Sequence, residues 1–116
     1  MLRDHPLAIS RQEGAASGTR IFTLTGPVTL PNLFTLQAEL RNGELPSRVI
    51  LDLSGVPYMD SAGMGAIINH FVHCQNRGVK LIAVGTCSRV HELFKMTKVD
   101  TVIPCCPTVE EAETLA

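Results

Sequence analysis

The sequence predicts one α/β domain over residues 1–116, with a mixed β-sheet of about five strands and about four helices. Three observations support this prediction. Short apolar runs rich in β-branched residues alternate with segments whose apolar residues recur at helical spacing. The first two runs have no helix between them, which favours an N-terminal hairpin followed by parallel strands. A chain of 116 residues is also long enough to bury one core without metals or disulfides.

The first part of the chain is expected to form a hairpin and one helix. Residues 7–12 alternate weakly, as an edge strand does, and small residues at 13–18 form the turn. A second strand follows at 20–26, where glycine and proline end it. From 31 to 41, three leucines recur at helical spacing, and Asn42-Gly43 is a natural helix end.

The middle of the chain has the pattern of a parallel β-α-β unit. Residues 47–53 contain an unbroken apolar run, which is typical of a central strand covered on both faces. A helix is expected from about 62 to 77, followed by a strand at 79–85 and a right-handed crossover between the two strands. One buried stripe of this helix is expected to contain Met64, Ile67, Ile68, Phe71 and Gln75.

The C-terminal part is expected to add two helices and one strand. A short helix is predicted at 87–96, with Thr86 or Ser88 as its N-cap. Residues 100–104 are predicted to form the last strand. The closing helix, 108–115, begins with the Thr-x-x-Glu spacing of a capping box.

The segment 58–65, between the central strand and the long helix, is the main candidate for a functional site. Ser61 is well placed to cap the helix, with its oxygen accepting from a backbone N–H of the first turn. Ala62, Gly63 and Gly65 leave the surroundings bare, so the hydroxyl is expected to be approachable from outside.

Three roles are open to Ser61 from the residues alone. A catalytic nucleophile would need a G-x-S-x-G elbow and a histidine base, and the sequence supplies neither. A helix cap is the structural alternative. A phosphate acceptor is compatible with a cap, because a phosphoryl group would face the positive end of the helix dipole. It would add a charge of about −1.5 to −2 at pH 7 and change the surface field.

The composition narrows the classes of partner. Hydrophobic residues make up 45% of the chain and charged residues 18%, with a net charge of −1. This balance indicates no nucleic-acid-binding surface, so we expect protein or small-molecule partners. The N-terminus lacks the pattern of a signal peptide, and no apolar stretch approaches the roughly 20 residues that span a membrane. We therefore expect a cytoplasmic protein without membrane insertion.

No cofactor or metal is expected. The sequence has no phosphate-binding loop of the Walker or G-x-G-x-x-G type. His70, His73 and Cys74 share one helical face, but no second cluster of ligands occurs elsewhere, so solvated helix-face histidines are expected instead. The four cysteines have no C-x-x-C spacing, and we expect free thiols, with Cys74 and Cys87 as small core residues.

Several segments together resemble a STAS domain, the fold of the bacterial anti-sigma factor antagonists, and the likeness covers nearly the whole chain. The segments are 49–56, 59–65 and 79–85, with weaker support from 93–100 and 109–112. The Asp-Ser-Ala-Gly turn after the Asp-Leu-Ser strand is the most specific of them. Thr29 stands where family members often have an acidic residue, and Lys98 stands where a glycine is common.

The resemblance implies a non-enzymatic, partner-switching regulator of transcription, of the kind used in stress responses. In that family the unphosphorylated antagonist binds an anti-sigma factor that is also a serine kinase, and this frees the sigma factor. Phosphorylation releases the antagonist, and a PP2C-type phosphatase restores it. Carried over to this chain, the phosphorylated residue is Ser61, with no catalytic residue. The implied partner-binding residues are Asp60, Ser61, Ala62, Gly63, Met64 and Gly65, with the glycines admitting a partner's backbone.

Two alternatives stay open. STAS domains also serve as unmodified accessory subunits of membrane transport complexes, such as ABC lipid-transport systems. An enzyme or nucleotide-binding role is the third hypothesis, for which the sequence offers no base, metal site or phosphate loop. The sequence leaves open the sigma factor, the kinase, the phosphatase, homodimer formation and the role of Cys105 and Cys106.

Overall fold

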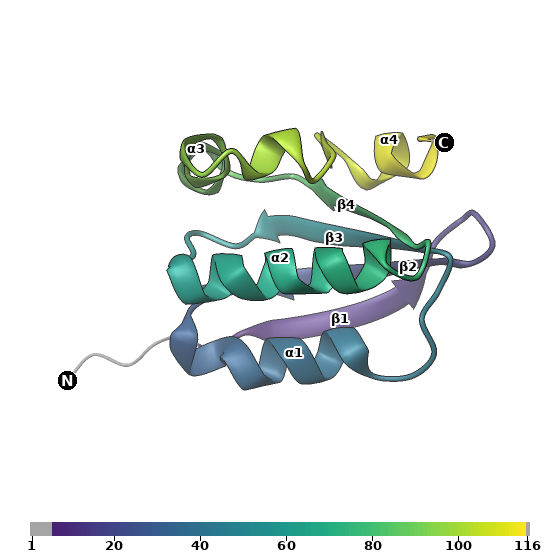
Figure 1. Cartoon of the computed structure of the whole chain (residues 1–116), viewed down its shortest axis with the longest axis horizontal. Coiled ribbons are helices and arrows are strands. Elements are labelled where there is room, and N and C mark those ends of the chain that lie inside the picture. The colour runs from purple at the N-terminus through teal and green to yellow at the C-terminus, as the bar shows by residue number, and fades with distance from the viewer. Residues whose placement is uncertain (1–5, 116) are drawn as a thin grey trace.

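The computed structural model describes residues 6–115, and in them a five-stranded mixed sheet carries four α-helices (Figure 1). The strands are β1 (Ala8–Glu13), β2 (Thr19–Thr25), β3 (Arg48–Gly55), β4 (Lys80–Val84) and β5 (Cys105–Cys106). The helices are α1 (Leu33–Arg41), α2 (Ser61–Gln75), α3 (Ser88–Met96) and α4 (Val109–Glu113), with 3₁₀ turns at Leu30–Asn32 and Val99–Thr101. The predicted α/β class and its numbers of strands and helices are confirmed.

The strands lie in chain order, β1-β2-β3-β4-β5. β1 and β2 pair antiparallel, whereas β2, β3, β4 and β5 pair in parallel. The predicted hairpin and the parallel unit that follows it are therefore both present. Because the carboxyl ends of the parallel strands meet at one edge of the sheet, the loops that follow β2, β3 and β4 gather there.

The sheet is covered on both faces. Neighbouring residues of β3 point to opposite faces, so Val49 and Leu51 enter the core beneath α1, α2 and α3, while Ile50 packs with Ala112 of α4. Figure 1 shows α1 and α2 lying side by side along one face of the sheet. The unbroken apolar run in β3 is explained by this two-sided burial.

The predicted strand at 100–104 is wrong. Lys98 adopts a left-handed conformation with φ 62°, and the chain then turns through the 3₁₀ segment Val99–Thr101. Val99 and Ile103 are buried four residues apart, a helical spacing that brings both into the core. The strand forms later, where Cys105 pairs with Ala83.

The start of α3 also differs from the prediction, whereas the start of α4 does not. At α3 the N-cap position is Cys87, whose thiol does not cap the helix but donates to the carbonyls of Val56 and Pro57. Neither Thr86 nor Ser88 serves as the cap. Cys87 is half-buried against the core. At α4 the predicted cap is confirmed, because the Thr108 hydroxyl accepts a hydrogen bond from the Glu111 N–H at 3.2 Å.

Candidate functional site

The candidate site is the turn that leads from β3 into α2, and backbone hydrogen bonds join it to the loop that follows β2. The Val28 N–H donates to the Tyr58 carbonyl at 3.1 Å, and the Asp60 N–H donates to the Val28 carbonyl at 3.2 Å. Val28 and Met59 thereby form a short parallel bridge beyond the ends of their strands. Two loops from neighbouring strands thus hold the start of α2 in place.

Asp60, not Ser61, is the N-cap of α2, so the prediction that Ser61 caps this helix is wrong. The Asp60 backbone is extended, and one carboxylate oxygen accepts from the Gly63 N–H at 2.8 Å. The second carboxylate oxygen accepts from the Leu30 N–H at 3.0 Å. Aspartate and serine are comparably good caps, and here the carboxylate also ties down the neighbouring loop.

Ser61 is the first residue of α2, and its side chain is exposed. No hydrogen bond engages its hydroxyl within the part of the chain that the structure describes. The first N–H groups of a helix have no acceptor inside the helix and produce a positive field there. The hydroxyl therefore stands at the electropositive end of α2, unused by the fold and open to a partner.

The structure divides the other predicted contact residues into two groups. Gly63 and Met64 are buried, and a Cβ at Gly63 would overlap the Val28 carbonyl oxygen. The expectation that Gly63 admits a partner's backbone is therefore wrong, because Gly63 admits the chain's own loop. Gly65 is exposed, with no atom within 4 Å of the position of a Cβ. Ala62 is half-buried beside Ser61.

Two exposed apolar side chains, one beside this turn and one a helical turn further along the chain, were missed from the sequence. Leu30, whose N–H is bound by Asp60, is 62% exposed, and Phe34, one helical turn further along, is 82% exposed. Large apolar side chains with this exposure are typical of contact surfaces when they cluster. The helical spacing of the leucines in α1 contained the signal, since Phe34 falls off the buried stripe.

The other feature of α2 that the sequence reasoning missed is His70, which is 2% exposed. The expectation of a solvated histidine is wrong for His70, because its side of α2 packs against α1. Burial, together with the charges of His73 and Arg41, lowers the pKa of His70 to about 4. The rings of His70 and His73 are stacked, with their centroids 5.7 Å apart.

The structure offers few other starting points for chemistry. Within residues 6–115, no three His, Cys, Asp or Glu side chains are grouped so that they could hold a metal ion. In the same range, no helix has the length and apolar character needed to cross a bilayer. All four cysteines are free thiols, with Cys74 buried as predicted. Thr29, which replaces an acidic residue common in the resembled family, is 6% exposed and points inward.

The sequence and the fold are similar to those of characterised proteins. A family model described as "STAS domain" matches residues 10–112. The anti-sigma-B factor antagonist of Listeria monocytogenes is 34% identical over 53 residues, which make up 46% of this chain and 46% of that protein. The match thus spans less than half of either protein.

Solved structures with the same fold come from two kinds of protein. A sulfate transporter family protein from Wolinella succinogenes has a TM-score of 0.77 and 22% identity, covering 86% of this chain and 85% of that one. The anti-sigma factor antagonist SpoIIAA in its unphosphorylated form has a TM-score of 0.67 and 17% identity, and the match covers 91% of this chain and 94% of that one. Phosphorylated SpoIIAA from Bacillus has a TM-score of 0.69 and 17% identity, and the match covers 90% of this chain and 96% of that one. Because the family model matches the chain from residue 10 to residue 112, this protein belongs to the STAS domain family.

Proposed function

We propose that this protein is an anti-sigma factor antagonist that works by partner switching and has no catalytic activity of its own. In its unphosphorylated form it binds an anti-sigma factor that is also a serine kinase, and phosphorylation of Ser61 releases it. The observation that supports this most directly is the Ser61 hydroxyl, which is exposed and left out of the helix cap. Similarity to the Listeria antagonist supports the class of partner.

The electrostatics of the turn suit a reversible modification. A phosphoryl group on Ser61 would face the positive end of α2, so the folded chain would tolerate it. It would also stand next to the Asp60 carboxylate, which two N–H groups hold in place. Adding about −1.5 to −2 charges beside a fixed carboxylate changes the field at a docking surface without disturbing the core.

The surface around Ser61 has the features of a protein-binding patch. Leu30 and Phe34 supply exposed apolar area, and Gly65 leaves room one turn along α2 from Ser61. Interfaces gain most of their affinity from a few such anchors, while neighbouring charges control partner choice. In this proposal the apolar pair contributes affinity for the partner. The phosphate on Ser61 removes that affinity by charge repulsion at the interface and by the cost of removing water from the phosphate. A PP2C-type phosphatase would reverse the modification in the cytoplasm.

The experiment that tests the proposal compares three variants for binding to a purified anti-sigma factor kinase from the same organism. Ser61→Asp introduces a charge at the proposed phosphorylation site, and we expect the dissociation constant to rise at least tenfold, about 1.4 kcal/mol. Ser61→Ala should bind like the unmodified protein and accept no phosphate. Ser17→Asp is the matched control, because Ser17 is exposed in the turn between β1 and β2. Figure 1 shows this turn at the opposite end of the sheet from the start of α2.

Two results would count against the proposal. If Ser61→Asp bound the kinase as tightly as the unmodified protein, the switch would lose its basis. If Ser17→Asp weakened binding as much as Ser61→Asp, the effect would come from net charge and not from the site.

The second candidate function is an unmodified accessory subunit of a membrane transport complex of the ABC lipid-transport kind. The observation that favours it is the similarity of the fold to a sulfate transporter family protein. In this case the same apolar pair, Leu30 and Phe34, would dock permanently. Capture from cell extract by the immobilised Ser61→Ala variant separates the two: an ABC ATPase among the captured proteins favours the transport role, and a small ATP-binding kinase favours the antagonist.

A further inference from the structure

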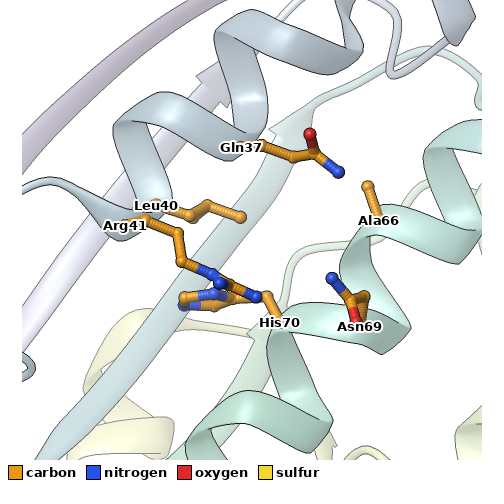
Figure 2. Close-up of a pocket in the computed structure, with 6 residues that line it drawn as sticks. All are labelled: Gln37, Leu40, Arg41, Ala66, Asn69 and His70. Carbon is orange, nitrogen blue, oxygen red and sulfur yellow. The ribbon is translucent and has the colours of Figure 1, made fainter.

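A pocket of about 170 Å³ lies between α1 and α2, away from the turn that carries Ser61. Its lining residues are Gln37, Leu40, Arg41, Ala66, Asn69 and His70. Figure 2 shows Arg41 reaching from α1 toward His70 on α2, and the Gln37 and Asn69 side chains projecting from the same two helices. Four of the six lining side chains are polar, although the pocket separates two helices that pack on one core.

His70 is the least expected member of this group. It is 2% exposed, and neither ring nitrogen has a hydrogen-bond partner among the residues that the structure describes. A buried polar group without a partner costs free energy, and such groups in native structures usually contact water or a ligand. Because burial and the neighbouring charges lower the pKa of His70 to about 4, the imidazole is neutral at pH 7. It then has one N–H donor and one acceptor nitrogen.

The remaining polar groups favour a negatively charged ligand. Arg41 has a guanidinium group that makes no ion pair or hydrogen bond within the described range. The amide groups of Gln37 and Asn69 add N–H donors from each helix. Among residues 6–115, no acidic side chain lines the pocket. A cation and several donors around an unpartnered imidazole form a site for an anion with several oxygens, which the guanidinium can bind in a bidentate manner.

The size of the pocket limits the ligand. A cavity of about 150 Å³ accommodates a molecule the size of benzene, with about six non-hydrogen atoms. The pocket of about 170 Å³ therefore accommodates inorganic phosphate or a short carboxylate. A nucleotide or a peptide is too large to be enclosed there.

We propose that the pocket between α1 and α2 is a binding site for a small oxyanion, of the inorganic phosphate or short monocarboxylate class. Its oxygens accept hydrogen bonds from the Arg41 guanidinium, the N–H of the neutral His70 ring and the side-chain amides of Gln37 and Asn69. Phosphate and carboxylate share the chemistry that this set of donors recognises, and the experiment below distinguishes them.

This site is separate from the proposed switch. His70 lies nine residues after Ser61 on the same helix, which at a rise of 1.5 Å per residue places it about 13.5 Å along the axis. An anion between α1 and α2 therefore does not occupy the surface around Ser61. Loss of one function leaves the other measurable.

The test is a titration followed by the NMR signals of the His70 ring, at constant ionic strength, with inorganic phosphate, acetate and chloride. We expect saturable shifts of these signals with phosphate or acetate and none with chloride, together with a rise of the melting temperature. Arg41→Gln should weaken the affinity at least tenfold, and because Arg41 is exposed this variant should fold normally. Arg77→Gln is the control, since Arg77 contacts His73 and does not line the pocket.

Each outcome has a defined meaning. Saturation by one of the two oxyanions supports the site and identifies its class. Unchanged His70 signals with both oxyanions would overturn the proposal. Equal affinity of Arg41→Gln and the unmodified protein would also overturn it, because the anion would then bind elsewhere.

Discussion

The start and the middle of α2 treat polar groups in opposite ways. At the start of α2, Asp60 satisfies two backbone N–H groups. The Ser61 hydroxyl, which makes no hydrogen bond within residues 6–115, faces outward. In the middle of α2, the polar ring of His70 is buried, with no hydrogen-bond partner in the described part of the chain. A satisfied turn with an exposed nucleophilic oxygen suits covalent modification, whereas an unsatisfied buried ring suits a ligand that completes it. The contrast indicates covalent modification at the start of α2 and ligand binding in its middle.

The variant with the largest expected effect on stability tests whether the turn depends on the close packing of Gly63 against Val28. Gly63→Ala would place a Cβ against the Val28 carbonyl oxygen, and we expect it to lower the free energy of unfolding by about 3 kcal/mol or more. Gly65→Ala is the matched control, because the same change two residues later meets open space. It should stabilise α2 by about 0.5–1 kcal/mol. Denaturant unfolding measures both, and equal effects would contradict the packing account.

The second prediction concerns pH and applies to the middle of α2. His70 has a pKa of about 4 in the folded chain and about 6.5 when unfolded, so the unfolded chain binds more protons between these values. The contribution of His70 to the free energy of unfolding is therefore constant above pH 6.5 and becomes destabilising as pH falls toward 4. We expect the free energy of unfolding to fall by about 3 kcal/mol at pH 4 and below because of His70. Other groups also titrate, so the measured quantity is the difference in the free energy of unfolding between the unmodified protein and His70→Leu at each pH.

The variant His70→Leu should flatten the pH dependence of the free energy of unfolding over this range. His73→Gln is the control on the same helix face, since the pKa of His73 is also lowered but its side chain is only half-buried. It should flatten the dependence less. A pH dependence that is the same with and without His70 would show that the ring titrates freely, and the contrast between the two regions would fail.

The smallest expected effects separate the cap from the modified residue. Asp60→Ala removes the acceptor for the N–H groups of Gly63 and Leu30, and we expect a loss of about 1–2 kcal/mol in the free energy of unfolding. Ser61→Ala should change it by less than about 0.5 kcal/mol, because the hydroxyl makes no bond in the fold. Thermal unfolding of the pair tests this order, and a larger loss for Ser61→Ala would restore Ser61 as the cap.

Local patterns were enough to predict the first four strands, the hairpin, the four helices and the position of the turn, but not the place of the last strand. Within the turn, Asp60 and Ser61 are adjacent residues with similar capping ability, so only the backbone geometry decides between them. Gly63 looked like an opening for a partner because its contact, Val28, lies 35 residues earlier in the chain.

In the middle of α2, the burial of each side chain depends still more on contacts with residues distant in sequence. His70 looked solvated because the sequence contains no sign of how α1 packs against α2. Exposure of Ile68 and burial of Ala66 show that the buried stripe is rotated from the one that was predicted, toward the side of His70. In the C-terminal part, Val99 and Ile103 satisfy both an alternating and a helical reading, and the left-handed Lys98 favours the helical one.

The proposed switch is tested most directly by the phosphorylation state of Ser61 in protein isolated from its own cells, measured by intact mass and site mapping. We expect phosphate on Ser61 in part of the population, with the fraction changing between growth and stress conditions. Absence of phosphate from Ser61 under all such conditions would contradict the proposed switch and favour an unmodified docking subunit.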